Sequence, residues 1–119
     1  MQEIVDRLKA LSDMTRLKIF KLILEQEFSV CELARLLNVS QPAVSQHLRR
    51  LKAVGLAEEE RRGQWIYYKG SEDVLNEFTQ SIAGFFASPL DKIEDFNDIL
   101  ILLSNRKNLE AECQNNLDL

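Results

Sequence analysis

The chain has 119 residues, 45% hydrophobic composition and a net charge of −4. This is the size of one ordinary domain, and the apolar content excludes a disordered chain. No apolar run approaches the ~20 residues of a membrane helix, residues 1–11 lack the apolar core of a secretory signal, and two cysteines do not make a disulfide framework. We therefore expect a cytoplasmic protein with no membrane partner.

The charge is divided unevenly along the chain. Residues 1–52 contain nine Lys and Arg against six Asp and Glu, a net +3, whereas residues 53–119 contain six against thirteen, a net −7. A DNA-binding surface requires a local basic patch that faces phosphates, and the whole chain need not be basic. The N-terminal half is therefore compatible with nucleic-acid binding, although two solvated faces would give the same pattern.

Two helices are predicted at the N-terminus. The first covers residues 1–11, and its apolar face is formed by Ile4, Leu8 and Leu11. Ser12 is expected to cap the second helix, with Asp13 in the first turn, where its charge suits the helix dipole. The polar residues 26–28 then predict a turn.

The next segment predicts two short helices. Ser29 and Glu32 have the spacing of a capping box, and Leu33, Leu36 and Leu37 form an apolar stripe behind it. The pattern breaks at residues 38–39. Ser40 then caps a helix that runs to about Ala53, with Pro42 in the first turn, where a missing N–H costs nothing. Gly55 is expected to close this helix.

The remaining chain predicts a hairpin and two further helices. The apolar period changes to two between residues 56 and 69, with residues 61–64 joining two strands. A helix is expected over 73–86, then a break at 88–89, a helix over 90–109 and a frayed tail. The fold class is mainly α with a β-hairpin wing, a winged helix-turn-helix. We expect a single domain over residues 1–119, with a core at about 1–88 and a C-terminal helix and tail at 89–119.

The function follows from the second short helix, which is polar and basic on one face. Glutamine pairs with adenine, arginine with guanine or phosphate, and the hairpin tip can lie along the DNA backbone. An ordinary surface helix is the alternative. The candidate DNA-binding residues are Ser40, Gln41, Ser45, Gln46, His47, Arg49, Arg50, Arg62 and Gln64.

Several runs of the sequence resemble the ArsR/SmtB family of bacterial winged-helix repressors. They are residues 11–19, 30–34, 37–48, 51–52, 55–56 and 63–68, and the run Ser-Gln-Pro-Ala-Val-Ser-Gln-His-Leu at 40–48 is the most specific. The resemblance covers about residues 1–88. It implies a homodimer, a dyad-symmetric double-stranded DNA operator and a repressor that an effector releases. It also implies that the first helix and the helix after the wing pair between subunits.

The resemblance also indicates which kinds of effector site to look for. Metal-sensing members often carry a Cys-x-Cys pair where this chain has Ser29 and Cys31, so the paired site is broken. A second family site needs histidines after the wing, where there are none. Cys31 and Cys113 together would give two thiolates for a metal or a metalloid such as arsenite, or a thiol redox switch. The alternative is that Cys31 is only a small buried residue and that Cys113 is an incidental residue of the tail.

Other classes of function have less support. A winged-helix module that binds protein instead of DNA would show no steep salt dependence, whereas Arg49→Ala and Arg62→Ala should each flatten the slope of a DNA-binding protein by about one unit. An enzyme is not expected. The single histidine, His47, lies on an exposed basic helix, the four glycines form no phosphate loop, and no cofactor is implied beyond the effector.

Overall fold

The computed structural model describes residues 1–117, as two compact units, Met1–Ile82 and the chain from Ala83 onward. The first unit opens with four helices and a short strand: α1 (Gln2–Leu11), α2 (Met14–Glu25), β1 (Phe28–Ser29), α3 (Val30–Leu37) and α4 (Gln41–Ala53). Strands β2 (Ala57–Arg62) and β3 (Trp65–Gly70) follow, and then α5 (Glu72–Ala87), in which the boundary between the units lies. This is the expected mainly helical fold with a hairpin.

Helices α2, α3 and α4 pack around one apolar core. Ile19 and Ile23 of α2, Leu33 of α3 and Leu48 of α4 are all completely or almost completely buried. These side chains recur at helical spacing, which is why each helix forms an apolar stripe and turns it inward. Leu36 was expected on the stripe of α3, but it is 59% exposed.

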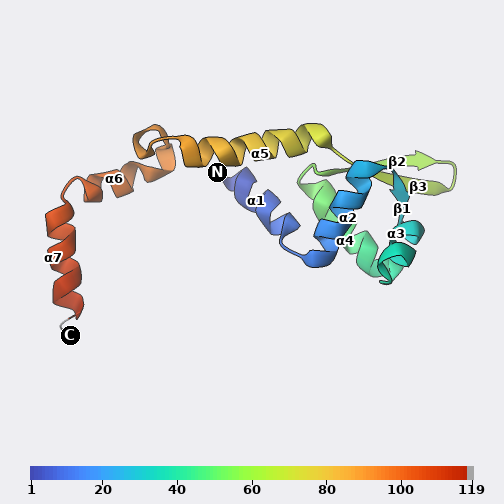
Figure 1. The fold of residues 1–119 in the computed structure, drawn as a ribbon, viewed down its shortest axis with the longest axis horizontal. Coiled ribbons are helices and arrows are strands. Elements are labelled where there is room, and N and C mark those ends of the chain that lie inside the picture. Colours follow the sequence, from blue (N-terminus) through green and yellow to red (C-terminus); the bar gives the residue numbers. More distant parts are fainter. Residues whose placement is uncertain (118–119) are drawn as a thin grey trace. The chain divides into compact units, whose positions relative to one another are not determined.

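The three strands form one antiparallel sheet in the order β1-β3-β2. Figure 1 shows the hairpin β2–β3 projecting from the helices of this unit. The turn has only two residues, Gly63 and Gln64, and Gly63 has φ +63°. Glycine at the first position of such a turn is typical of a type II′ hairpin. The strands are therefore longer than expected, since Arg61 and Arg62 belong to β2 and not to the turn.

Two predicted boundaries at the N-terminal helices were wrong. Ser12 closes α1, because its hydroxyl donates to the Lys9 carbonyl, and Asp13 caps α2 by accepting the backbone N–H of Arg16 at 2.9 Å. The predicted turn over residues 26–28 ends in strand β1, which pairs with β3 at Tyr67 and Tyr68.

The second unit also departs from expectation. Instead of one helix over 90–109, it has two 3₁₀ turns, η1 (Leu90–Lys92) and η2 (Glu94–Phe96), and two helices, α6 (Asn97–Leu103) and α7 (Arg106–Leu117). The break has a local cause, because the Ser104 hydroxyl donates to the Ile101 carbonyl and the Asn105 side chain accepts the N–H of Asn108 as a new cap. The predicted frayed tail is helical up to Leu117, and residues 118–119 lie outside the described chain.

No helix within residues 1–117 is long and apolar enough to span a bilayer. The expectation of a single domain over 1–119 stays a prediction.

Candidate nucleic-acid interface

Helix α3 begins in the predicted capping box. The Ser29 hydroxyl accepts the N–H of Glu32 at 3.2 Å, and the Glu32 carboxylate accepts the N–H of Ser29 at 2.8 Å. These two bonds satisfy backbone donors that a helix start otherwise leaves free. The start of α3 is thus fixed, and the Ser29 hydroxyl is committed to the backbone.

A short turn then sets the direction of the next helix. Asn38 ends α3 in the left-handed conformation, with φ 55° and ψ 47°, and Ser40 caps α4 by accepting the N–H of Ala43 at 3.2 Å. Asparagine tolerates this conformation better than most residues. Pro42 lies in the first turn, as expected. Helices α3 and α4 therefore form the predicted helix-turn-helix.

Helix α4 has one buried face and one polar face. Val44, Leu48 and Leu51 are completely buried against α2 and α3. The opposite side carries most of the predicted DNA-binding residues. Ser40, Gln41, Gln46, Arg49 and Arg50 are exposed, and Ser45 is partly exposed.

The two arginines of this face differ from the other cations nearby. Neither Arg49 nor Arg50 has a carboxylate within 4.0 Å among residues 1–117, whereas Lys52, on the last turn, holds Glu59 at 2.6 Å. Amides with free donors and acceptors can read base edges, and free guanidinium groups can bind phosphates or guanine. The polar face of α4 has the chemistry of a recognition helix.

His47 is placed differently from its neighbours on α4. Its side chain is 19% exposed, its Nδ1 accepts a bond of 3.2 Å from Arg16 Nε, and its Nε2 lies 3.9 Å from the Asp13 carboxylate. It thus faces the start of α2. A DNA contact by His47 stays a prediction, although the structure gives its ring other neighbours.

Arg16 was not among the residues predicted to matter. It is 5% exposed, yet it carries a charge and bonds to two other helices. One sequence signal could have found it, because Arg16 stands in the apolar stripe of α2 at helical spacing from Ile19, Phe20 and Ile23.

The hairpin tip carries Arg62 and Gln64. Arg62 Nη2 lies 2.6 Å from Glu27 and 3.0 Å from Glu60, and its guanidinium lies 5.0 Å from the centre of the Tyr67 ring. The hydrogen bond to Glu60, together with the charge of Glu27, raises the pKa of Arg62 above its ordinary value. Gln64 is exposed. Arg62 is therefore paired with two carboxylates, Glu60 of its own strand and Glu27 of the segment before β1.

The two thiols lie on different helices. Cys31 is half-buried on the first turn of α3, and Cys113 is exposed on α7, not in a tail beyond the last helix as expected. Within residues 1–117, no three Cys, His, Asp or Glu side chains are grouped so that they could hold a metal ion. A site that joins Cys31 and Cys113 stays a prediction.

Comparisons with known proteins agree with this geometry. Residues 13–59 match the model of a family described as "Bacterial regulatory protein, arsR family". The chain is 45% identical over 62 residues to the arsenic resistance transcriptional regulator ArsR1 of Pseudomonas putida, which covers 51% of this chain and 48% of that protein. It is 32% identical over 88 residues to the nodulation protein NolR of Rhizobium meliloti, covering 74% of this chain and 72% of NolR.

A solved structure shows the same fold. It is the homodimeric winged helix-turn-helix DNA-binding domain Mb0332 of Mycobacterium bovis, described as a possible ArsR-family transcriptional regulator, with a TM-score of 0.60 and 32% identity. The match covers 69% of this chain and 79% of that one. The chain spans only about half the length of ArsR1. The descriptions of the family and of ArsR1 are those of regulators and not of enzymes.

Proposed function

The chain belongs to the arsR family of bacterial regulatory proteins, and from this premise we propose that it is a homodimeric, sequence-specific transcriptional repressor of the cytoplasm, which an effector releases from a dyad-symmetric DNA operator. The observation that carries the proposal is the polar face of α4. This capped helix stands on a fully buried apolar face and presents two glutamines and two arginines without carboxylate partners among the described residues.

Each part of that face has a task in the proposed complex. Gln41 and Gln46 read base edges in the major groove, while Arg49 and Arg50 bind phosphates or guanine. The N-terminal turn of α4, with Ser40 as its cap, suits a phosphate oxygen, because free N–H groups and the helix dipole both favour an anion. Gln64 at the hairpin tip extends the contact along the backbone.

The proposed dimer is supported by apolar side chains that the single chain leaves in water. On α1, Val5 is 37% and Leu8 49% exposed, and on the second half of α5, Phe86 is 79% exposed. Phe78, on the first half of the same helix, is only 4% exposed, so it does not add to this surface. Two copies would place their α4 helices about one DNA turn, ~34 Å, apart.

The proposed effector is a thiophilic ion such as arsenite, bound by Cys31 and Cys113. The name of ArsR1 connects that relative to arsenic resistance. In this chain both cysteines are free, and Cys31 lies on α3 only two residues after the capping serine. Because the Ser29 hydroxyl serves the capping box, it does not supply the missing ligand. An ion with three thiolates would take one of them from the other subunit.

Salt dependence tests the DNA-binding part. The affinity for a duplex selected from a randomised library should fall steeply with salt, and Arg49→Ala should flatten the log–log slope by ~0.9. Arg106→Ala on α7 is the matched control and should leave the slope unchanged. A flat salt dependence of the unaltered protein would favour the alternative of a module that binds protein.

Release tests the effector part. Arsenite, antimonite or cadmium should displace the protein from the selected duplex, and Cys31→Ser should bind DNA normally yet resist release. If peroxide releases the protein and dithiothreitol reverses the effect, whereas the ions do nothing, the two free thiols act as a redox switch instead.

A further inference from the structure

We infer that Arg16 is a positioning residue for DNA binding, which holds the recognition helix α4 through His47 and does so only while the imidazole is uncharged. The inference rests on the proposed function. It assigns His47 a role on the protein side of α4 and not on the DNA side.

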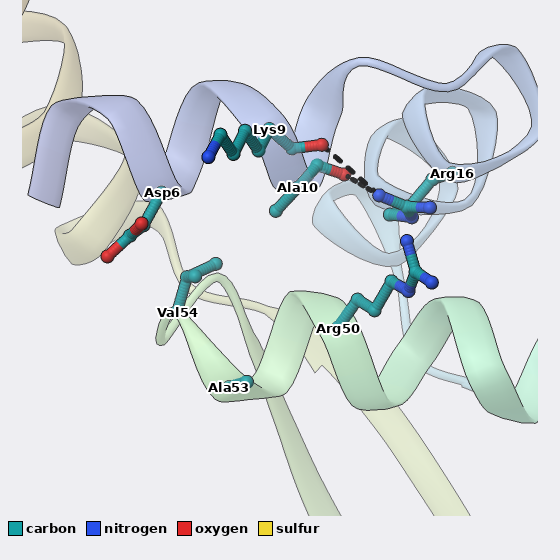
Figure 2. Close-up of a pocket in the computed structure, with 7 residues that line it drawn as sticks. All are labelled: Asp6, Lys9, Ala10, Arg16, Arg50, Ala53 and Val54. Atoms are coloured by element: carbon teal, nitrogen blue, oxygen red, sulfur yellow. Dashed lines mark hydrogen bonds between the residues drawn. The ribbon is translucent and has the colours of Figure 1, made fainter.

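Arg16 joins the end of α1 to the start of α2. Its Nη1 donates to the carbonyls of Ala10 at 2.9 Å and Lys9 at 3.3 Å, which lie at the end of α1 (Figure 2); the Lys9 carbonyl also accepts from Ser12. No carboxylate lies within 4.0 Å of the guanidinium in the described chain, so carbonyl oxygens at the negative end of a helix dipole compensate this buried charge. The position of Arg16 is therefore set by α1 and α2.

The third bond of Arg16 reaches α4. Its Nε donates to His47 Nδ1 at 3.2 Å across 31 residues of sequence. A ring nitrogen accepts a hydrogen bond only when it carries no proton, so the ring is neutral with its proton on Nε2. Nε2 lies 3.9 Å from the Asp13 carboxylate, which is longer than a hydrogen bond. The recognition helix is thus tied to α1 by two steps, His47 to Arg16 and Arg16 to the end of α1.

Protonation of the ring would break this tie. An imidazolium would turn an Nδ1–H toward the Arg16 Nε–H and put two cations in contact. The charged groups that face the ring are Arg16 and Asp13 of α2. Next to Arg16, a pocket of about 270 Å³ between α1 and α4 is lined by the further charged groups Asp6, Lys9 and Arg50 (Figure 2). Asp13 attracts an imidazolium, but it cannot replace the lost donor–acceptor pair.

The two possible roles of His47 predict opposite effects of acid. A histidine that contacts phosphate strengthens DNA binding when it is protonated, whereas a histidine tied to Arg16 loses its bond on protonation and weakens DNA binding. His47 is the only histidine of the chain, so variants at this one position remove every imidazole and test whether an acid effect depends on it.

The decisive measurement is the affinity for the selected fluorescein-labelled duplex at pH 7.5 and 5.5, with folding checked by circular dichroism at both values. We expect wild-type binding to weaken about fivefold to thirtyfold at pH 5.5, the effect of losing one such interaction. His47→Asn places an acceptor oxygen near the position of Nδ1, so it should bind as wild type at pH 7.5 and lose the acid effect. His47→Gln, whose amide reaches the position of Nε2, should bind weakly at both values.

Two arginine variants separate positioning from general support. Arg16→Lys keeps a charge at the end of α1 but cannot serve three acceptors, so it should weaken binding at pH 7.5 and remove the acid effect. Arg7 is the matched control, because its Nε donates to the Val54 carbonyl at the end of α4 at 3.1 Å. Arg7→Lys should keep the acid effect whatever it does to stability.

Binding that strengthens at pH 5.5, or a glutamine variant that outperforms the asparagine variant, would overturn the inference. Nitrogen-15 NMR of the single imidazole gives a readout without DNA. A neutral ring protonated on Nε2, with a shift of Nδ1 in Arg16→Lys, supports the tie, and a ring protonated on Nδ1 contradicts it. If the protein selects no duplex at either pH, the proposed function fails, and the NMR result shows whether the tie itself exists.

Discussion

The recognition helix α4 and the hairpin β2–β3 use their cations in opposite ways. On α4, Arg49 and Arg50 have no carboxylate partner within the described chain, whereas on the hairpin Arg62 is held by Glu27 and Glu60. Lys69 of β3 likewise lies 3.6 Å from Glu58. The two guanidinium groups of α4 have no carboxylate partner in the described chain, whereas these two hairpin cations are paired with acidic side chains of the protein itself.

The two regions also differ in how firmly they are attached. Helix α4 buries three large side chains completely, but β2 is exposed at every position after Ala57. A surface that must read bases has to keep its geometry, and burial supplies that rigidity. The hairpin is held by the hydrogen bonds between its strands and by exposed ion pairs, so it is the more adaptable of the two regions.

The largest expected effect is a loss of stability, and it should be greater at α4 than at the hairpin. Leu48→Ala should destabilise the protein by about 2–5 kcal/mol, because it leaves a cavity beneath the recognition helix. Trp65→Ala on the hairpin, where the side chain is 54% exposed, should cost much less. Urea unfolding followed by circular dichroism measures both, and similar losses would show that the hairpin is as firmly anchored as α4.

A smaller effect is expected at the start of the recognition helix. Ser40→Ala removes the acceptor for the Ala43 N–H and should cost ~1 kcal/mol of stability. Ser40→Asp keeps a cap and should retain stability, but its negative charge would face a phosphate and weaken DNA binding. Equal DNA affinities of Ser40→Ala and Ser40→Asp would show that the start of α4 does not contact the phosphate backbone.

Much of α4 could be predicted from sequence because its determinants are local. Its cap Ser40, Pro42 and the apolar positions Val44, Leu48 and Leu51 lie within 12 residues of one another. The same locality explains the correct start of α3. Family resemblance added the dimer and the operator, which no local pattern contains.

The parts that sequence reasoning missed depend on distant partners. The bond between Arg16 and His47 joins residues 31 apart in sequence, and the ion pair of Arg62 with Glu27 also joins separate segments, so neither contact could be read from a local pattern. Strand β1 has only two residues and exists through its pairing with β3. Local signals, such as helix propensity or a capping residue, contain no information on contacts that form only once the chain has folded.

The contrast in charge can be sharpened by freeing the hairpin cation. The double variant Glu27→Gln/Glu60→Gln removes both carboxylates from Arg62, so this guanidinium should become available to phosphate. We expect tighter DNA binding and a log–log salt slope steeper by up to ~0.9, which is roughly a threefold greater loss of affinity between 50 and 200 mM salt.

The control for this prediction is the same double substitution in an Arg62→Ala background. Loss of two negative charges alone would strengthen binding in both backgrounds, whereas release of Arg62 acts only when the arginine is present. A gain of the same size in the Arg62→Ala background would show that the ion pairs do not restrain the hairpin cation.

The smallest expected effect is acid loosening of the hairpin at Glu59. The hydrogen bond from Lys52, followed by that from Tyr68, lowers the pKa of Glu59 below its ordinary value. A carboxylate whose pKa is lower in the folded state stabilises the fold above its ordinary pKa, and this contribution is lost as the pH falls through the folded value. Below about pH 4.3, therefore, the link between α4 and β2 should weaken. Trp65, the only tryptophan, reports on the hairpin by fluorescence. Glu59→Gln should abolish the acid step in this signal, and Glu25→Gln, which removes a similar carboxylate from α2, should leave it in place.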